Sequence, residues 1–199
     1  MIRLRRPEAP AFLAEHGNAW SERWAARRAE DPAARFRWVS YEGTAVNLHV
    51  RPLLAAMTAG HCAYCDASEL GAVSLETIDH FRPKDAFPLH AYAWANLFPA
   101  CDVCQNTKGN QFVDELLKPD DDEYTFERFF LYDVKTGELE PNPGARAEDQ
   151  RRAAETIRIF GLNLHGRPTS RKRMRERRLR QGDDPEPLDT WPYRFAVMT

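Results

Sequence analysis

The sequence has no apolar run of the length that spans a membrane, although 43% of its 199 residues are hydrophobic. A transmembrane helix needs about 20 consecutive apolar residues. A basic opening with Arg3, Arg5 and Arg6 is followed by Pro7 and Pro10, where a secretory signal would have its apolar stretch. These absences predict one soluble domain with its own core and with no membrane as a partner. If the thiols of the chain bind zinc, a reducing cytoplasm is the expected compartment.

The chain also has no large excess of one charge, because 28 Lys and Arg stand against 30 Asp and Glu, for a net charge of −2. This balance excludes a protein that coats nucleic acid by bulk electrostatics, so any contact with phosphates must come from a local patch. Residues 171–180 contain seven cations in ten positions. This stretch either binds phosphates or docks on an acidic partner surface, and the sequence leaves both possibilities open.

Cysteine is scarce, and all four cysteines occur in two CxxC pairs, Cys62/Cys65 and Cys101/Cys104. No thiol is left for a disulfide framework or for a nucleophile, so a structural zinc site is favoured over redox use. The 35 residues between Cys65 and Cys101 exceed the usual separation in a zinc ribbon. A folded segment must therefore be inserted between the two pairs.

An acid next to a histidine, Asp79-His80, lies in this inserted segment. Residues 73–81 predict a strand, and residues 102–108 predict a helix, which gives a β-β-α order around the zinc. Strict alternation along a strand would point the two side chains to opposite faces, so we expect them at a strand end or a bulge. A carboxylate can hold a metal ion and a histidine can act as a general base, so the chemistry is expected between residues 60 and 112.

These motifs resemble those of the HNH, or ββα-metal, endonucleases that have a zinc frame of two CxxC pairs. The family pattern runs CxxC, Asp-His, Asn-Leu, then CxxC followed by a polar residue and a lysine, and about residues 60–112 match it. More narrowly, the chain is similar to the PtuB group, the HNH nuclease subunits of Septu and retron-associated anti-phage systems. The segments that carry this similarity are Met1-Ile2-Arg3-Leu4-Arg5-Arg6, Cys62-Ala63-Tyr64-Cys65, Asp79-His80-Phe81-Arg82-Pro83-Lys84, Trp94-Ala95-Asn96-Leu97 and Thr156-Ile157-Arg158-Ile159-Phe160-Gly161-Leu162-Asn163.

The resemblance implies a role for each matched residue. His80 would be the general base that takes a proton from the attacking water, and Asp79 would be a ligand of the catalytic metal. Asn96 would brace the loop and orient the histidine. The catalytic metal would be a hard ion that prefers oxygen, Mg²⁺ or Mn²⁺, in addition to the structural Zn²⁺ held by the four cysteines.

The last position of the motif departs from the family pattern, because Gln105 stands where Asn or His is commoner. Gln105 and the following Asn106 both offer an amide oxygen, so either could be the second ligand of the catalytic metal. The substrate phosphate is assigned to Arg82, Lys84 and Lys108, and Lys108 is also counted among the catalytic residues. Two other histidines are minor candidates: His61 as a group supporting the zinc ligands and His90 as a group near the substrate.

The expected fold class is α+β, with a small zinc-stapled ββα-metal core embedded in a mainly helical single domain. Three regions are predicted: 1–59, helical and packed on the core; 60–118, the nuclease core; and 119–199, helical, with the basic stretch and an aromatic tail.

Apolar spacing predicts helices over residues 11–30 and 146–160, the latter ending at Gly161. It also predicts a helix over about 50–59, closed by Gly60, for which Pro52 marks the start or a bend.

The function expected is that of a metal-dependent DNA endonuclease, the effector of an anti-phage system, acting with a PtuA-like ATPase partner. The alternatives are a zinc-scaffolded nucleic-acid-binding module without catalysis and a subunit that regulates an ATPase. The sequence contains no recognisable base-reading motif, so it does not distinguish DNA from RNA or single strands from double strands.

Overall fold

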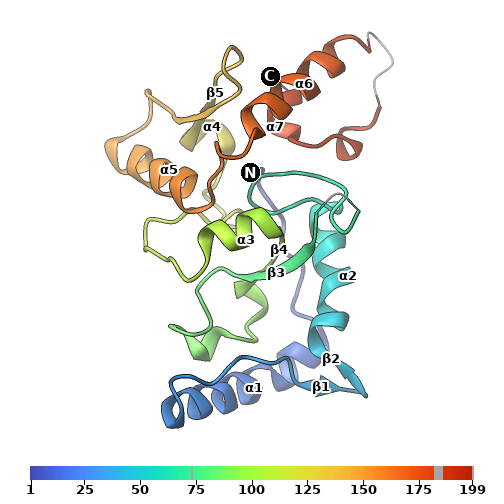
Figure 1. Ribbon diagram of the computed structural model, residues 1–199, viewed down its shortest axis with the longest axis vertical. Helices are drawn as coiled ribbons and strands as arrows, with labels where there is room; N and C mark the ends of the chain where they lie inside the picture. Colours follow the sequence, from blue (N-terminus) through green and yellow to red (C-terminus); the bar gives the residue numbers. More distant parts are fainter. Residues whose placement is uncertain (73, 182–185, 199) are drawn as a thin grey trace.

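The computed structural model of the protein describes residues 1–72, 74–181 and 186–198 (Figure 1). The helices are α1 (Ala11–Glu30), α2 (Val46–Thr58), α3 (Asp102–Lys108), α4 (Phe126–Phe129), α5 (Ala147–Ile159), α6 (Arg167–Leu179) and α7 (Arg194–Val197), with short 3₁₀ helices η1 (Pro88–His90), η2 (Trp94–Asn96) and η3 (Leu188–Thr190). The strands form antiparallel pairs, β1 (Ser40–Tyr41) with β2 (Thr44–Ala45), β3 (Glu76–His80) with β4 (Leu97–Cys101), and β5 (Phe130–Tyr132) with β6 (Leu139–Pro141). The predicted α+β class is confirmed. Within the described ranges, no helix combines the length and the apolar character needed to cross a bilayer.

The centre of the molecule is the β3–β4 hairpin followed directly by α3 (Figure 1). Its register pairs His80 with Leu97 and Asp79 with Phe98, so β3 ends at His80. A strand end is one of the two placements, a strand end or a bulge, that the sequence leaves open for the acid-histidine pair. The predicted strand over 73–81 is thus shorter in the structure, and Val73 lies outside the described residues.

Two hydrophobic clusters cover the hairpin. The α1-side cluster joins α1, α2 and residues 34–41 to Ile78 and Leu97 of the hairpin. The cysteine-side cluster contains the four cysteines together with β5, β6 and part of α5. Along the longest axis the order is α1 at one end, the hairpin and α3 in the middle, and α5 to α7 at the other end (Figure 1).

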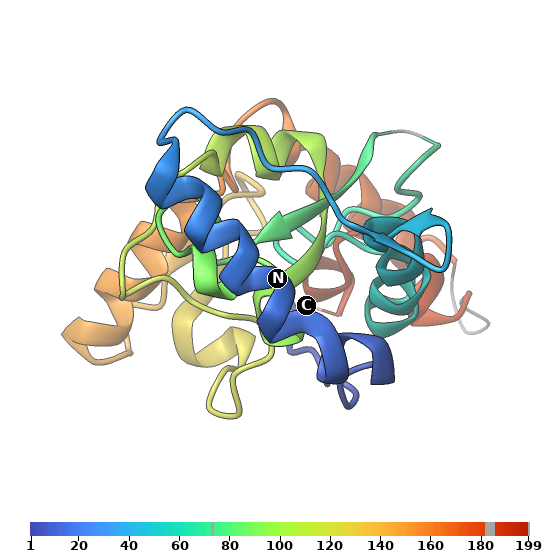
Figure 2. The same ribbon diagram turned by 90° about the horizontal axis from the view of Figure 1, so that it is seen from below.

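The predicted helix over 11–30 is confirmed as α1 with the same bounds. Trp20 and Trp24 are buried, whereas the first two rings of the predicted stripe, Phe12 and His16, are half-buried. A Cβ atom at Gly17 would lie 3.1 Å from the carbonyl oxygen of Tyr92. Glycine therefore lets α1 approach the loop that carries η1 and η2, and Figure 2 shows α1 crossing this end of the molecule.

The second predicted helix begins earlier than expected, because α2 starts at Val46 and Pro52 lies inside it. The expectation that the helix would start or bend at the proline is wrong about the start. The end is as predicted: Ala59 and Gly60 both have positive φ, and the Gly60 amide donates to Ala55 O at 2.8 Å. This contact closes the last turn of the helix.

In the C-terminal part, α5 ends as predicted just before Gly161, which has a φ of 57°. The basic stretch forms most of α6. The short β5–β6 sheet was not predicted from the sequence, since strands of three residues are too short to show a pattern.

Candidate metal centre and active site

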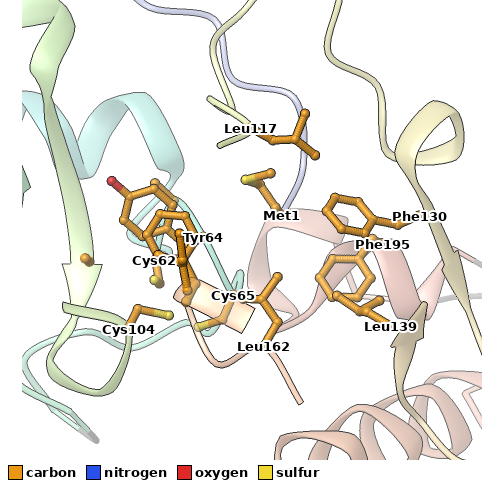
Figure 3. Packing of buried hydrophobic residues seen from close by; sticks show 14 of the residues in the cluster. Met1, Cys62, Tyr64, Cys65, Cys104, Leu117, Phe130, Leu139, Leu162 and Phe195 are labelled. Carbon is orange, nitrogen blue, oxygen red and sulfur yellow. The ribbon is translucent and has the colours of Figure 1, made fainter. Parts of the chain in front are cut away.

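The four cysteines form a buried cluster in which all ligand sulfur atoms lie within 4.8 Å of one another. Cys65 Sγ and Cys101 Sγ are 3.7 Å apart. A tetrahedral zinc site with Zn–S bonds of about 2.3 Å has sulfur–sulfur edges of about 3.8 Å. Figure 3 shows Cys62, Cys65 and Cys104 converging beside Tyr64. The cluster therefore has the donor set and spacing of a structural zinc site, as the cysteine spacing predicts.

A positive charge from α6 lies against this cluster. Arg167 is buried, and its Nη2 lies 3.2 Å from Cys104 Sγ and 3.6 Å from Cys101 Sγ. Its Nη1 donates to the carbonyl oxygens of Phe160 and Gly161 at 3.0 and 2.6 Å. Burial lowers the pKa of Arg167, but the neighbouring thiolates raise it by more, so the guanidinium stays charged. Sequence reasoning missed this residue, because nothing local connects it to cysteines more than 60 positions away.

The first CxxC pair is also tied to the C-terminal tail. Asp66, next to Cys65, accepts hydrogen bonds from Arg194 Nη2 at 2.6 Å and from Nε at 3.1 Å. The Nε2 atom of His61 lies 3.0 Å from Trp191 O. Its Nδ1 atom lies near the carbonyl oxygens of Thr58 and Ala59. His61 therefore contacts backbone carbonyls rather than a cysteine, and it connects the C-terminal tail to the segment just before Cys62.

Asp79 is buried at the junction of the first CxxC pair, β3 and α3. Its Oδ2 accepts from the Tyr64 hydroxyl at 2.7 Å, and its Oδ1 lies 3.1 Å from Lys108 Nζ. Lys108 also donates to the His80 carbonyl oxygen at 2.7 Å, and Tyr64 is stacked on Phe160. Burial lowers the pKa of Lys108, although the charge of Asp79 opposes this. Each carboxylate oxygen has one partner and keeps capacity for another.

His80 points to the opposite side of the hairpin. Its Nε2 lies 2.9 Å from Ala91 O. Its ring is stacked on Trp38 and meets Phe36 edge-on, and the distance between ring centres is 5.4 Å in each case. Since a carbonyl oxygen only accepts, Nε2 carries the proton and Nδ1 keeps its lone pair. Burial, with a smaller effect of the Lys84 charge, lowers the pKa of His80 to about 3. The imidazole is therefore neutral at physiological pH.

A hollow of about 240 Å³ opens beside these two residues. Five of the predicted site residues border it, namely Asp79, His80, Lys84, Gln105 and Asn106. Gln105 Nε2 donates to Ile78 O at 3.1 Å, which fixes the amide and leaves its oxygen as an acceptor. Asn106 is exposed. Lys108 does not border the hollow, but it contacts Asp79, which does.

Asn96 and Arg82 lie on the other side of the loop between β3 and β4. The Asn96 side chain accepts from the Arg82 amide at 2.7 Å and donates to Arg82 O and His90 O at 3.0 Å each. These three contacts join the start of the loop, at Arg82, to its later part, at His90 and Asn96. The Arg82 side chain lines a separate hollow, so the structure does not bring it together with Lys84.

The basic stretch is partly internal. Arg171 is fully buried and donates to Gly137 O and Asn163 Oδ1, both at 3.1 Å. Arg177 and Arg178 lie over the ring of Trp191, at 5.1 and 5.9 Å. Part of α6 therefore holds the C-terminal tail in place.

Comparison with known proteins shows a distant, partial similarity. No protein-family profile matches the chain. Over 61 residues, 31% of this chain, the sequence is 31% identical to the Septu protein PtuB of Bacillus thuringiensis. The aligned segment spans 24% of that protein. The chain is thus distantly related to PtuB over part of its length.

Proposed function

We propose that the protein is a metal-dependent HNH endonuclease that hydrolyses DNA phosphodiester bonds. The observation that carries the proposal is the hydrogen bonding and the neutral form of the His80 imidazole. Its Nε2 is held by Ala91 O, and its Nδ1 makes no hydrogen bond with any residue that the structure describes. A neutral histidine with a free lone pair, beside a carboxylate and two amides at one hollow, suits a general base next to a hard metal ion.

In the proposed reaction, Nδ1 of His80 accepts a proton from a water molecule. The water oxygen forms the new bond to phosphorus while the bond to the 3′ oxygen breaks. A negative phosphate in the hollow raises the pKa of the ring, because an opposite charge favours the protonated imidazole. A divalent ion, when bound, supplies positive charge to the scissile phosphate and to the leaving oxygen.

The chain offers Asp79 and Gln105 to hold such an ion. Gln105 is favoured over Asn106 because its amide is oriented by the hydrogen bond to Ile78 O. Lys84 borders the hollow and is the cation best placed for the phosphate. Lys108 takes a positioning role in this proposal, because its ammonium group is engaged by Asp79 and the His80 carbonyl.

The distant relation to PtuB supports a place in a Septu-type system. On this proposal the protein is the effector nuclease of an anti-phage defence, and it acts with an ATPase partner similar to PtuA. Because the sequence of this small protein carries no base-reading motif, its nuclease activity would need control by an external partner.

One observation favours a second candidate, a zinc-scaffolded binding module without catalysis. Asp79 and Lys108 form a buried ion pair with side-chain exposures of 4% and 1%, so both could serve the fold alone. The two candidates differ in whether His80 is needed for cleavage or only for packing.

Plasmid cleavage in Mg²⁺ or Mn²⁺ tests the proposal, with His80→Asn compared with the matched control His165→Asn. His165 is exposed and has a φ of 56°, which asparagine tolerates. We expect His80→Asn to reduce cleavage by about 10²-fold or more, the range for loss of a general base, and the control to cleave normally. Zinc content must be equal in all three proteins. Full cleavage by His80→Asn would refute the assigned base, and intact zinc with no cleavage, even with an ATPase partner, would favour the binding module.

A further inference from the structure

A second hollow of about 340 Å³ lies next to the proposed active site, on the Asn96 side of the loop between β3 and β4. It brings together groups from distant parts of the chain that the proposed reaction does not use. The lining residues that matter here are Arg82, Phe112, Lys118, Arg152, Asp114 and Asp121.

Arg82 is a fixed cation with free donors. Its guanidinium lies 5.5 Å from the ring centre of Phe87 and 5.4 Å from that of Phe112. Its backbone amide and carbonyl are both held by Asn96. Within the described residues, the guanidinium makes no hydrogen bond and no ion pair. A guanidinium positioned by aromatic rings loses little side-chain freedom when it binds a phosphate through its N–H groups.

Two further cations face the same hollow. Arg152 comes from α5, where Nε donates to Glu115 O at 3.2 Å and the guanidinium lies 5.3 Å from the ring centre of Phe129. Lys118 Nζ is 3.0 Å from Asp120 Oδ1, so its charge is partly matched already. The remaining N–H groups of Arg152 make no hydrogen bond within the part of the chain that the structure describes.

The hollow also offers groups for a base. Phe112 is half-buried, and an aromatic face of this kind stacks on any nucleobase, with Arg82 already lying over that ring. The carboxylates of Asp114 and Asp121 can accept hydrogen bonds from base amino groups. The lining thus combines two cations, Arg82 and Arg152, that make no ion pair within the described residues with two carboxylates, while Lys118 is already paired with Asp120.

We propose that this hollow binds one nucleotide unit, with its phosphate on Arg82 and Arg152 and its base against Phe112. The inference deepens the proposed nuclease function and rests on it for the position of the unit within a strand. Arg82 follows His80 by two residues, which span at most about 7 Å of extended chain. The bound unit would therefore flank the phosphate that is cleaved.

Binding without cleavage tests the site. Fluorescence anisotropy with a labelled single-stranded 12-mer DNA, without added divalent metal, compares Arg152→Gln with Arg151→Gln. Both variants remove one charge from α5, but Arg151 is exposed and does not line the hollow. We expect Arg152→Gln to weaken binding at least about fivefold and to reduce the salt slope by about one, with less than a twofold change for Arg151→Gln.

Further measurements make the result specific. Arg152→Lys should restore most of the salt slope, and far-UV circular dichroism and zinc content should show that every variant is folded. Unlabelled thymidine monophosphate distinguishes two sources of the ligand. Competition at submillimolar concentration indicates that the hollow binds a free nucleotide. No competition indicates that it binds a nucleotide within a strand. Equal effects of Arg151→Gln and Arg152→Gln, or no binding by the wild type, would overturn the proposal. Because no cleavage is measured, loss of the nuclease proposal alone would leave this binding result intact.

Discussion

The two clusters on either side of the β3–β4 hairpin are built from different interactions. The cysteine-side cluster contains four thiols and is bordered by buried charged side chains, among them Asp66, Arg167, Arg171 and Arg194. Figure 3 shows its apolar part, where Leu162 lies beside Cys65 and Phe195 is grouped with Phe130 and Leu139. The α1-side cluster is dominated by aromatic rings, among them Trp20, Trp24, Phe36, Trp38 and Tyr92. The cysteine side therefore combines apolar packing with buried charges and the donor set of a zinc site, whereas the α1 side consists mainly of apolar packing.

The candidate active site uses both sides through two successive residues. Asp79 faces Tyr64 and Lys108 on the cysteine side, whereas His80 lies between Trp38 and Phe36 on the α1 side. A ligand of a hard metal ion, the role proposed for Asp79, needs a polar surrounding, and a neutral histidine, as proposed for the base His80, needs a dry one. The end of a strand with different environments on its two faces supplies both. Substitutions on the cysteine side should therefore affect the proposed metal ligand Asp79 first, and substitutions on the α1 side should affect His80 first.

Removal of the metal site should have the largest effect. Cys62→Ser removes one ligand, and structural zinc contributes about 10–16 kcal/mol of apparent binding free energy, which is as large as the stability of a typical domain. We expect loss of zinc and of hydrogen-exchange protection in β5, β6 and α5, with protection retained longest in α1. Metal analysis and exchange mass spectrometry measure both. A zinc-free variant that melts at the wild-type temperature would contradict this view of the cysteine side.

A buried charge on the cysteine side should have the next largest effect. Asp66→Asn leaves the buried Arg194 without its buried carboxylate partner, since the carboxylate that remains, Asp189, is exposed. This change should cost about 3–5 kcal/mol. Asparagine tolerates the φ of 61° at this position, so backbone strain does not contribute. The control is Asp189→Asn, because Asp189 binds the same guanidinium but its side chain is 70% exposed. That change should cost less than about 1 kcal/mol in urea unfolding of the zinc-loaded protein. Equal costs would show that burial does not set the strength of these pairs.

The sequence predicts the parts of the molecule that local patterns determine. The tryptophan spacing of α1, the two CxxC spacings of the cysteine cluster and the strand that leads into Asp79-His80 are all visible along a few residues, although the sequence leaves open whether the pair lies at a strand end or a bulge. Each of these features depends on residues a few positions apart, so periodicity or spacing along the chain is sufficient to predict it.

The surroundings of the site depend on contacts between distant residues. Arg194 meets Asp66 across 128 positions, and no local pattern indicates this pairing. Trp38 lies in a stretch without regular structure, yet it stacks on His80. The alternation of Phe36 and Trp38 is the signal that sequence reasoning overlooked, since residues two apart in an extended chain point to the same side.

On the α1 side, loss of a ring next to His80 should have a moderate effect on stability. Trp38→Leu removes the stacked face, which should cost about 1–2 kcal/mol in urea unfolding, and should shift the imidazole proton resonances of His80. The control Phe12→Leu removes a ring that is stacked on Tyr41 in the same cluster and is not in contact with His80. We expect similar losses of stability from both changes and normal zinc content, with a shifted His80 spectrum only in Trp38→Leu. An unchanged His80 spectrum would show that Trp38 does not position the ring.

An exposed ion pair should have the smallest effect. Glu155 and Arg158 lie on the surface of α5, three residues apart, with a distance of 2.6 Å and side-chain exposures of 36% and 56%. Water screens this pair, so Glu155→Gln should change the free energy of unfolding by less than about 0.5 kcal/mol. The pair is shorter than several contacts of the buried charges, such as the 3.1 Å between Lys108 and Asp79. A loss comparable to that of Asp66→Asn would mean that distance sets the strength of these pairs, whereas a negligible loss would assign the difference to burial on the cysteine side.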